Sequence, residues 1–139
     1  MEKGQIVRRK VNNDTPVGPY MIIRGFIRNH VLTQRCEIGM ESENVNSLYY
    51  AREHIYIPKI IRLIIQDAIW DRIAEGRQSA IIHDITPVWQ KIYDTEPELI
   101  QLRSRKYPQK VMIYTVDRIA DCYYNRTRQI RLGLGYRIL

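Results

Sequence analysis

The pattern that most restricts the possible folds is a regular series of apolar residues between positions 57 and 73. Its spacing of three or four residues is that of the buried face of an α-helix, and it contains Ile57, Ile61, Ile64 and Ala68. Ser42 and Asn44 are alternative N-caps for this helix, which we expect to end near Glu75, with Gly76 as its stop signal. Because proline has no backbone N–H, Pro58 predicts a kink in the helix or its division into two.

The flanking sequence also favours helices. A first helix is expected at 20–34, with Ile23, Ile27 and Val31 on one face. Thr86 followed by Pro87 is typical of a helix N-terminus, and further helices are expected at 87–93, 97–107 and 108–132. The apolar stretch 79–85 is interpreted either as a strand or as a buried loop. The sequence therefore predicts an all-α protein, a helical bundle with one long, kinked helix.

The N-terminal segment differs from the rest of the chain. Residues 1–18 show no sustained periodicity, and turn-forming residues are dense from position 12 to 19. We therefore expect an extended basic arm at 1–18, which contains the cluster Arg8, Arg9 and Lys10, and a helical domain at 19–139.

The charge of the chain indicates a polyanionic partner. There are 22 Lys and Arg residues against 15 Asp and Glu, which gives a net charge of +7. Such a balance is typical of proteins that bind nucleic acid or an anionic membrane surface, although small domains also carry charge for solubility. Arg outnumbers Lys 16 to 6, and guanidinium groups hold phosphates with two parallel hydrogen bonds. A genomic or thermal bias is an alternative cause of the arginine excess.

The charge is concentrated at both ends of the chain. The net charge is +5 over residues 1–35, −5 over 36–102 and +7 over 103–139. An acidic middle segment that meets the basic end of a second copy would favour self-association. The candidate nucleic-acid-binding residues are Lys3, Arg8, Arg9, Lys10, Arg24, Arg28, Arg35, Arg52, Lys59 and Arg62, and a possible secondary patch contains Arg126, Arg128 and Arg131. Tyr123 and Tyr124 near the secondary patch suit base stacking or a core edge equally well.

No pattern of catalytic residues is present. The sequence contains no nucleophile elbow, phosphate-binding glycine loop or dinucleotide fingerprint. His30, His54 and His83 do not have the spacing of metal ligands. We therefore expect a protein that is not an enzyme and that has neither a cofactor nor a metal site. The chemistry instead favours backbone binding without base readout.

Two further features bear on location. Cys36 and Cys122 are far apart and form either one disulfide or, as is commoner inside cells, two free thiols. The polar N-terminus does not resemble a signal peptide, and no apolar window is long enough for a transmembrane segment. We expect an intracellular protein, or part of a particle that assembles in the cytoplasm.

The expected layout resembles the nucleocapsid (major coat) proteins of filamentous archaeal viruses. The features that carry the resemblance are the basic arm, the Thr15–Pro19 break, the arginine-bearing first helix and the Pro58 kink. The composition, rich in Ile, Arg and Tyr, also suits a hot-spring host.

That resemblance implies a structural subunit that packages double-stranded DNA. In that family, paired subunits wrap A-form duplex in a helical filament, so the implied partners are DNA and a second copy or a paralogous coat subunit. The basic residues of the arm and the first two helices would face the DNA, and the protein would be located in the virion. The alternative hypothesis is a helical adaptor subunit of a replication or transcription complex.

Overall fold

The computed structural model describes residues 1–12, 14–38 and 47–139. Within these residues, ten β-strands, two α-helices and one turn of 3-10 helix follow one another. The protein is mostly β, so the prediction of an all-α helical bundle is wrong. The chain divides into two compact units, and this boundary does not coincide with the expected division after residue 18: unit 1 comprises residues 1–58 and 138–139, and unit 2 comprises residues 59–137.

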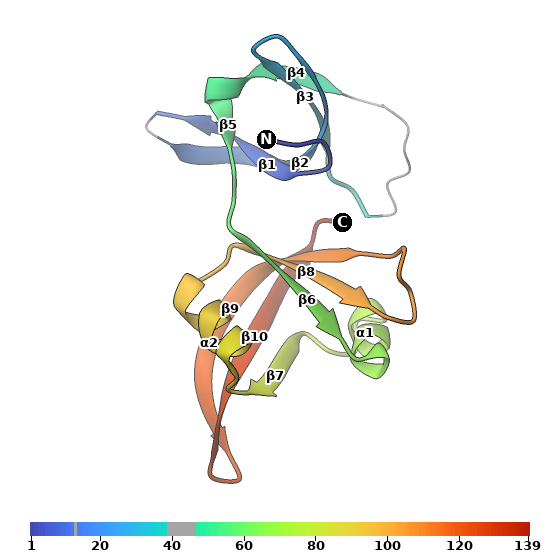
Figure 1. Ribbon diagram of the computed structural model, residues 1–139, viewed down its shortest axis with the longest axis vertical. Coiled ribbons are helices and arrows are strands. Elements are labelled where there is room, and N and C mark those ends of the chain that lie inside the picture. Colours follow the sequence, from blue (N-terminus) through green and yellow to red (C-terminus); the bar gives the residue numbers. More distant parts are fainter. Residues whose placement is uncertain (13, 39–46) are drawn as a thin grey trace. The chain divides into compact units, whose positions relative to one another are not determined.

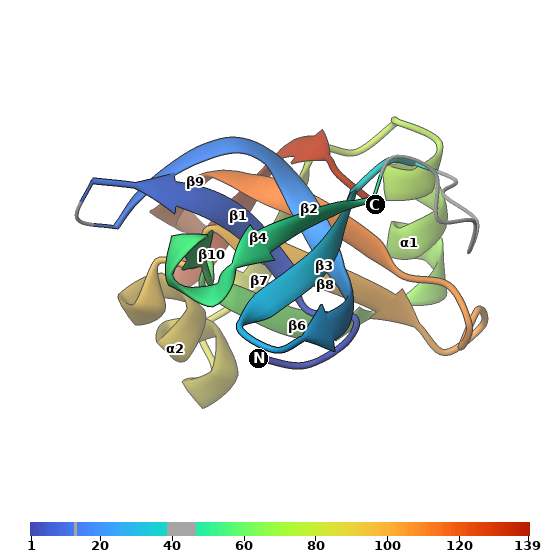
Figure 2. The same cartoon turned by 90° about the horizontal axis from the view of Figure 1, so that it is seen from above.

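Unit 1 contains a five-stranded antiparallel sheet in the order β4-β3-β2-β1-β5. Its strands are β1 (Ile6–Val11), β2 (Thr15–Ile27), β3 (His30–Arg35), β4 (Leu48–Ala51) and β5 (Ile55–Tyr56). The edge strands β4 and β5 are connected only by the 3-10 turn η1 (Arg52–His54). So short a connection requires the sheet to curl until its two edges approach each other, which makes unit 1 a small barrel (Figure 1). Figure 2 shows how strongly β2 bends along its length.

The interior of the barrel is filled by Val7, Met21, Ile23, Val31 and Ile55. Met21 and Ile23 are buried and alternate with more exposed neighbours, which is the two-residue period of a strand. A register shift between Ile23 and Gly25 changes this alternation further along β2.

Two predictions fail in this unit. The segment 1–18 is not an extended arm, because it contains β1 and the beginning of β2. The segment 20–34 is not a helix, because it consists of most of β2, a two-residue turn and most of β3. Arg24, Arg28 and Arg35 therefore do not form a stripe on one helix face: they lie on β2, in the turn and at the end of β3.

Unit 2 contains a mixed five-stranded sheet in the order β6-β8-β9-β10-β7. The elements are β6 (Ile60–Ile65), α1 (Asp67–Ala74), β7 (Ala80–Asp84), α2 (Pro87–Thr95), β8 (Leu99–Ser104), β9 (Met112–Tyr124) and β10 (Thr127–Arg137). β6 and β8 are parallel, and the other pairs are antiparallel.

The prediction of a long, kinked helix is also wrong. Between Leu48 and Ala74 the chain forms β4, η1, β5, β6 and α1, and Pro58 lies between two strands; the predicted N-caps fall outside the described residues. The helices expected at 97–107 and 108–132 are replaced by β8, β9 and most of β10. Two predictions from short stretches of sequence are confirmed. The Thr86 side chain accepts a hydrogen bond from the backbone N–H of Trp89 at the start of α2, and the strand alternative for 79–85 is confirmed as β7.

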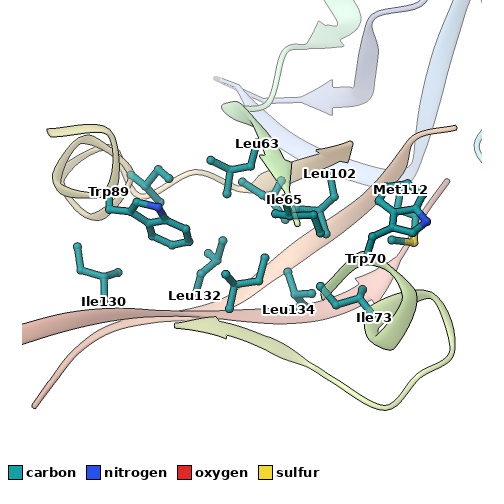
Figure 3. Close-up of a cluster of buried hydrophobic side chains, with 13 residues drawn as sticks. Leu63, Ile65, Trp70, Ile73, Trp89, Leu102, Met112, Ile130, Leu132 and Leu134 are labelled. Atoms are coloured by element: carbon teal, nitrogen blue, oxygen red, sulfur yellow. The ribbon is translucent and has the colours of Figure 1, made fainter. Parts of the chain in front are cut away.

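A single hydrophobic core holds unit 2 together (Figure 3). Trp70 and Ile73 from α1, and Trp89 and Ile92 from α2, contribute to this core. The inward-facing side chains of the strands complete it, among them Leu63, Ile65, Ile100, Leu102, Ile130 and Leu132. Leu102, Ile130 and Leu132 are completely buried, so the helices and the sheet are tightly packed against each other.

Candidate nucleic-acid interface

A row of three side chains crosses the neighbouring strands β2, β3 and β4 of unit 1. Phe26 on β2 pairs with Val31 on β3, which in turn pairs with Tyr50 on β4. Directly paired residues lie on the same face of a sheet, so these three side chains are neighbours. Val31 is completely buried, whereas Phe26 and Tyr50 are partly buried and pack against the edge of the core.

The row has an aromatic ring at each end, and a guanidinium group lies over each of these two rings. The Arg52 guanidinium carbon lies 5.1 Å from the centroid of the Phe26 ring. That of Arg9 lies 5.9 Å from the centroid of Tyr50. β1 and β4 are not neighbours in the sheet, so the contact between Arg9 and Tyr50 joins two strands that do not pair with each other.

A third arginine lies on the adjoining hairpin turn. Arg28 and Asn29 form the two-residue connection between β2 and β3. The backbone N–H of Arg52 donates to the carbonyl oxygen of Asn29 at 2.9 Å, which holds this turn against η1. We name Arg9, Arg28, Arg52, Phe26 and Tyr50 the arginine–aromatic patch.

The backbone at Arg28 is strained. Its φ of +51° lies in the left-handed region, where a Cβ atom approaches the following carbonyl oxygen and glycine is preferred. Residues held in such conformations cost about 1–3 kcal/mol and cluster at functional sites. An arginine in place of glycine at the tip of a hairpin therefore favours a role for its side chain.

The patch is electropositive. Arg9, Arg28 and Arg52 are all exposed, and none of them forms an ion pair with a described residue. His30 and His54 are exposed beside them, since His30 begins β3 and His54 ends η1. Glu53 is the one acidic residue in η1 and the Arg28–Asn29 turn.

The other predicted cations of unit 1 are engaged or lie elsewhere. Arg8 donates to the carbonyl oxygen of Gly18 at 3.0 Å, Lys10 pairs with Asp14 at 2.8 Å, and Arg24 donates to Gln34 at 2.8 Å. Lys3 and Arg35 are exposed near the N-terminus and at the end of β3. Lys59 and Arg62 belong to unit 2. The structure thus brings together three of the ten primary candidates: Arg9, Arg28 and Arg52.

The predicted secondary patch is divided. Arg128 donates to both carboxylate oxygens of Asp121 at 3.0 Å, and this acid raises the pKa of the guanidinium above its ordinary value. Arg131 pairs with Ala120 and lies on the sheet face opposite to Arg128. Arg126 lies in the turn between β9 and β10 and has no ion pair with a described residue.

Sequence reasoning missed three aromatic residues that hold cations: Phe26, Tyr107 and Tyr20, whose ring centroid lies 5.1 Å from the Arg8 guanidinium carbon. Phe26 is the only phenylalanine of the chain, and nothing in its neighbourhood predicts that Arg52 lies over it. Tyr107 has two lysine ammonium groups over its ring, Lys106 at 5.1 Å and Lys110 at 5.0 Å. The spacing of Lys106, Tyr107 and Lys110 was a usable signal for this second arrangement.

In the described residues, no cluster of three or more His, Cys, Asp or Glu side chains is suited to hold a metal ion. Cys36 and Cys122 are free thiols, and burial raises the pKa of Cys36 to about 12, although Arg24 acts in the opposite direction. Helices α1 and α2, of eight and nine residues, are too short to cross a bilayer.

No family model, curated protein or solved structure matches this chain.

Proposed function

We propose that this protein binds nucleic acid through the arginine–aromatic patch, by phosphate contacts that do not depend on base sequence. The observation that carries the proposal is the set of three exposed arginines without acidic partners among the described residues, two of them held over aromatic rings. A polyanion can supply the missing counter-charge.

The geometry suits phosphate oxygens. A guanidinium group stacked on a ring keeps its N–H groups at its edge free, and these match two oxygens of one phosphate. Contact with Phe26 and Tyr50 also restricts the Arg52 and Arg9 side chains, so less conformational entropy is lost on binding.

The proposal concerns binding rather than packaging. The resemblance to filament-forming coat proteins depended on a helical layout that the structure does not have. The alternative expectation, an adaptor subunit, predicts little affinity for free DNA and therefore the opposite result in a titration.

Fluorescence anisotropy with two short duplexes of unrelated sequence tests the proposal. We expect equal affinities for both, and a logarithmic salt slope of about −0.9 for each phosphate neutralised between roughly 50 and 200 mM salt. In the triple variant Arg9→Gln, Arg28→Gly and Arg52→Gln, the slope should become shallower by about 2–3. Glutamine keeps the aliphatic stem over each ring, and glycine fits the left-handed position.

A matched control removes the same charge at cations that already have acidic partners. Lys10→Gln, Arg77→Gln and Lys106→Gln change cations that are paired with Asp14, Glu75 and Asp71, so their combined effect on the slope should be much smaller. Three results would overturn the proposal: an equal loss in both triple variants, no binding at low salt, or binding to vesicles of anionic lipid but not to DNA.

A further inference from the structure

A second surface that suits nucleic acid lies at the end of unit 2. β8 pairs with β9 only over Met112–Thr115, and β7 pairs with β10 only over Gln129–Gly133. The part of β9 and β10 beyond these pairings is a free two-stranded ribbon, which Figure 1 shows extending past β7. We name residues 123–128 the ribbon tip.

The ribbon tip has an exposed aromatic ring on each face. Tyr123 is 76% exposed and Tyr124 is 67% exposed. Consecutive residues in a strand point to opposite faces, so the two phenol rings project from opposite sides of the ribbon. Rings this exposed contribute little to the core, and their contact area is available to a ligand.

The turn that closes the ribbon contains an arginine where glycine is favoured. Asn125 and Arg126 have φ values of +48° and +63°, as in the type I′ turn of a two-residue hairpin. Asparagine tolerates the left-handed region, but glycine is the usual second residue. Retaining Arg126 costs stability and places a cation at the outermost point of the ribbon.

The nearby negative charge is neutralised. Asp121 is held by both hydrogen bonds from Arg128, and Arg126 has no ion pair with a described residue. The ribbon tip therefore combines a free cation with two flat rings, which is the combination that single-stranded nucleic acid recognises: phosphates contact the cation, and bases stack on the rings.

We propose that the ribbon tip binds unpaired bases, with Tyr123 or Tyr124 stacked on a base and Arg126 on a neighbouring phosphate. This inference rests on the proposed function and deepens it, because it names single-stranded nucleic acid as the preferred ligand of the second surface. Base faces inside a duplex are covered by their neighbours, so the rings reach them only in single strands, gaps and ends. The whole protein accordingly binds a single strand more tightly than the phosphate contacts alone would allow.

Competition between a single strand and a duplex of equal length tests the inference on the full chain. In Tyr123→Ala with Tyr124→Ala, we expect affinity for the single strand to fall about 5- to 100-fold and affinity for the duplex to stay unchanged. Tyr123→Phe with Tyr124→Phe should restore binding, since phenylalanine keeps the stacking surface. Tyr136→Ala is the matched control, because this tyrosine of β10 is also 64% exposed but lies outside the ribbon tip.

Photo-crosslinking gives a direct readout. A single strand that carries 5-iodouracil should form its adducts with Tyr123 or Tyr124, located by mass spectrometry. Adducts elsewhere, or an alanine pair that binds the single strand like the parent protein, would overturn the ribbon inference while duplex binding by the arginine–aromatic patch stands. A protein that binds neither ligand would overturn both.

Discussion

The two units complete their cores with different side chains. In unit 2, the helices α1 and α2 place Trp70 and Trp89 against the sheet, so apolar rings close most of the core, and cations lie over a ring only at the Tyr107 edge among the described residues. In the described part of unit 1, the core ends at Phe26 and Tyr50, and the charged side chains of Arg52 and Arg9 cover these rings.

This difference bears on how binding and stability are coupled. Arg9 and Arg52 cover the rings at the edge of the core, and in the proposed function they also contact the ligand, so a change at either residue should affect both properties. The rings of Tyr123 and Tyr124 at the ribbon tip are more exposed than those of Phe26 and Tyr50, so at the ribbon tip binding and stability should separate. The predictions below test this contrast, from the largest expected effect to the smallest.

Trp89→Ala should lower the free energy of unfolding of unit 2 by about 3–5 kcal/mol, because it removes a large ring from a tight core. Both tryptophans of the chain lie in unit 2, so urea unfolding followed by the fluorescence of Trp70 reports this unit alone. Hydrogen exchange at the Val31 amide reports unit 1. If the protection of the Val31 amide falls by as much as the free energy of unfolding of unit 2, the two units unfold together and the contrast between two separate cores is lost.

Cys36 should make unit 1 sensitive to alkaline pH. Burial raises the pKa of its thiol from 9.0 to about 12, so between these values the unfolded chain loses a proton that the folded chain keeps. The contribution of the Cys36 thiol to the free energy of unfolding is therefore fully present below about pH 9. Above that pH it declines by about 1.4 kcal/mol per pH unit. Urea unfolding by circular dichroism should show this slope in the parent protein and a shallower one in Cys36→Ala; identical slopes would contradict the prediction.

Arg52→Ala should destabilise unit 1 by about 0.5–1 kcal/mol, since it uncovers the Phe26 ring and removes a cation–π contact. Hydrogen exchange at Val31 measures the loss. Lys10→Ala is a suitable comparison within unit 1, because the Asp14 partner of its ion pair is largely exposed and the pair should contribute little. Equal effects would show that Arg52 does not help to close the core.

Arg126→Gly should stabilise unit 2 by about half a kcal/mol, because glycine relieves the left-handed strain, and it should weaken binding of a single strand. Urea unfolding and anisotropy on the same sample measure the two effects. A variant that loses stability and binding together would show that stability and binding are coupled at the ribbon tip as well.

Part of the fold was predictable and part was hidden by specific residues. Gly76 as a helix stop is confirmed, since α1 ends at Ala74 and Gly76 has a φ of +74°. The series from Ile57 to Ala68 has helical spacing by coincidence: in β6, Leu63 and Ile65 are the buried residues and alternate with exposed ones. The 22 isoleucines were the better signal, because β-branched residues favour strands.

The two surfaces were hidden for a related reason. A hairpin is usually recognised by Asn-Gly or a similar pair between two apolar runs. Here the turns read Arg28-Asn29 and Asn125-Arg126, so arginine stands where the glycine signal is expected, and the sequence pattern of both hairpins predicts a helix. The cations themselves were identified from the sequence, but grouping Arg9 with Arg52 requires the curled sheet that brings β1 near β4.

The position of an arginine in each of these two turns has a practical consequence. Trypsin cleaves after arginine, and exposed loop tips are the preferred sites of limited proteolysis. The peptide bonds after Arg28 and Arg126 therefore act as built-in reporters, one in each unit. Protection of the first bond by a duplex, and of the second by a single strand, would give a footprint of each surface without any substitution or label.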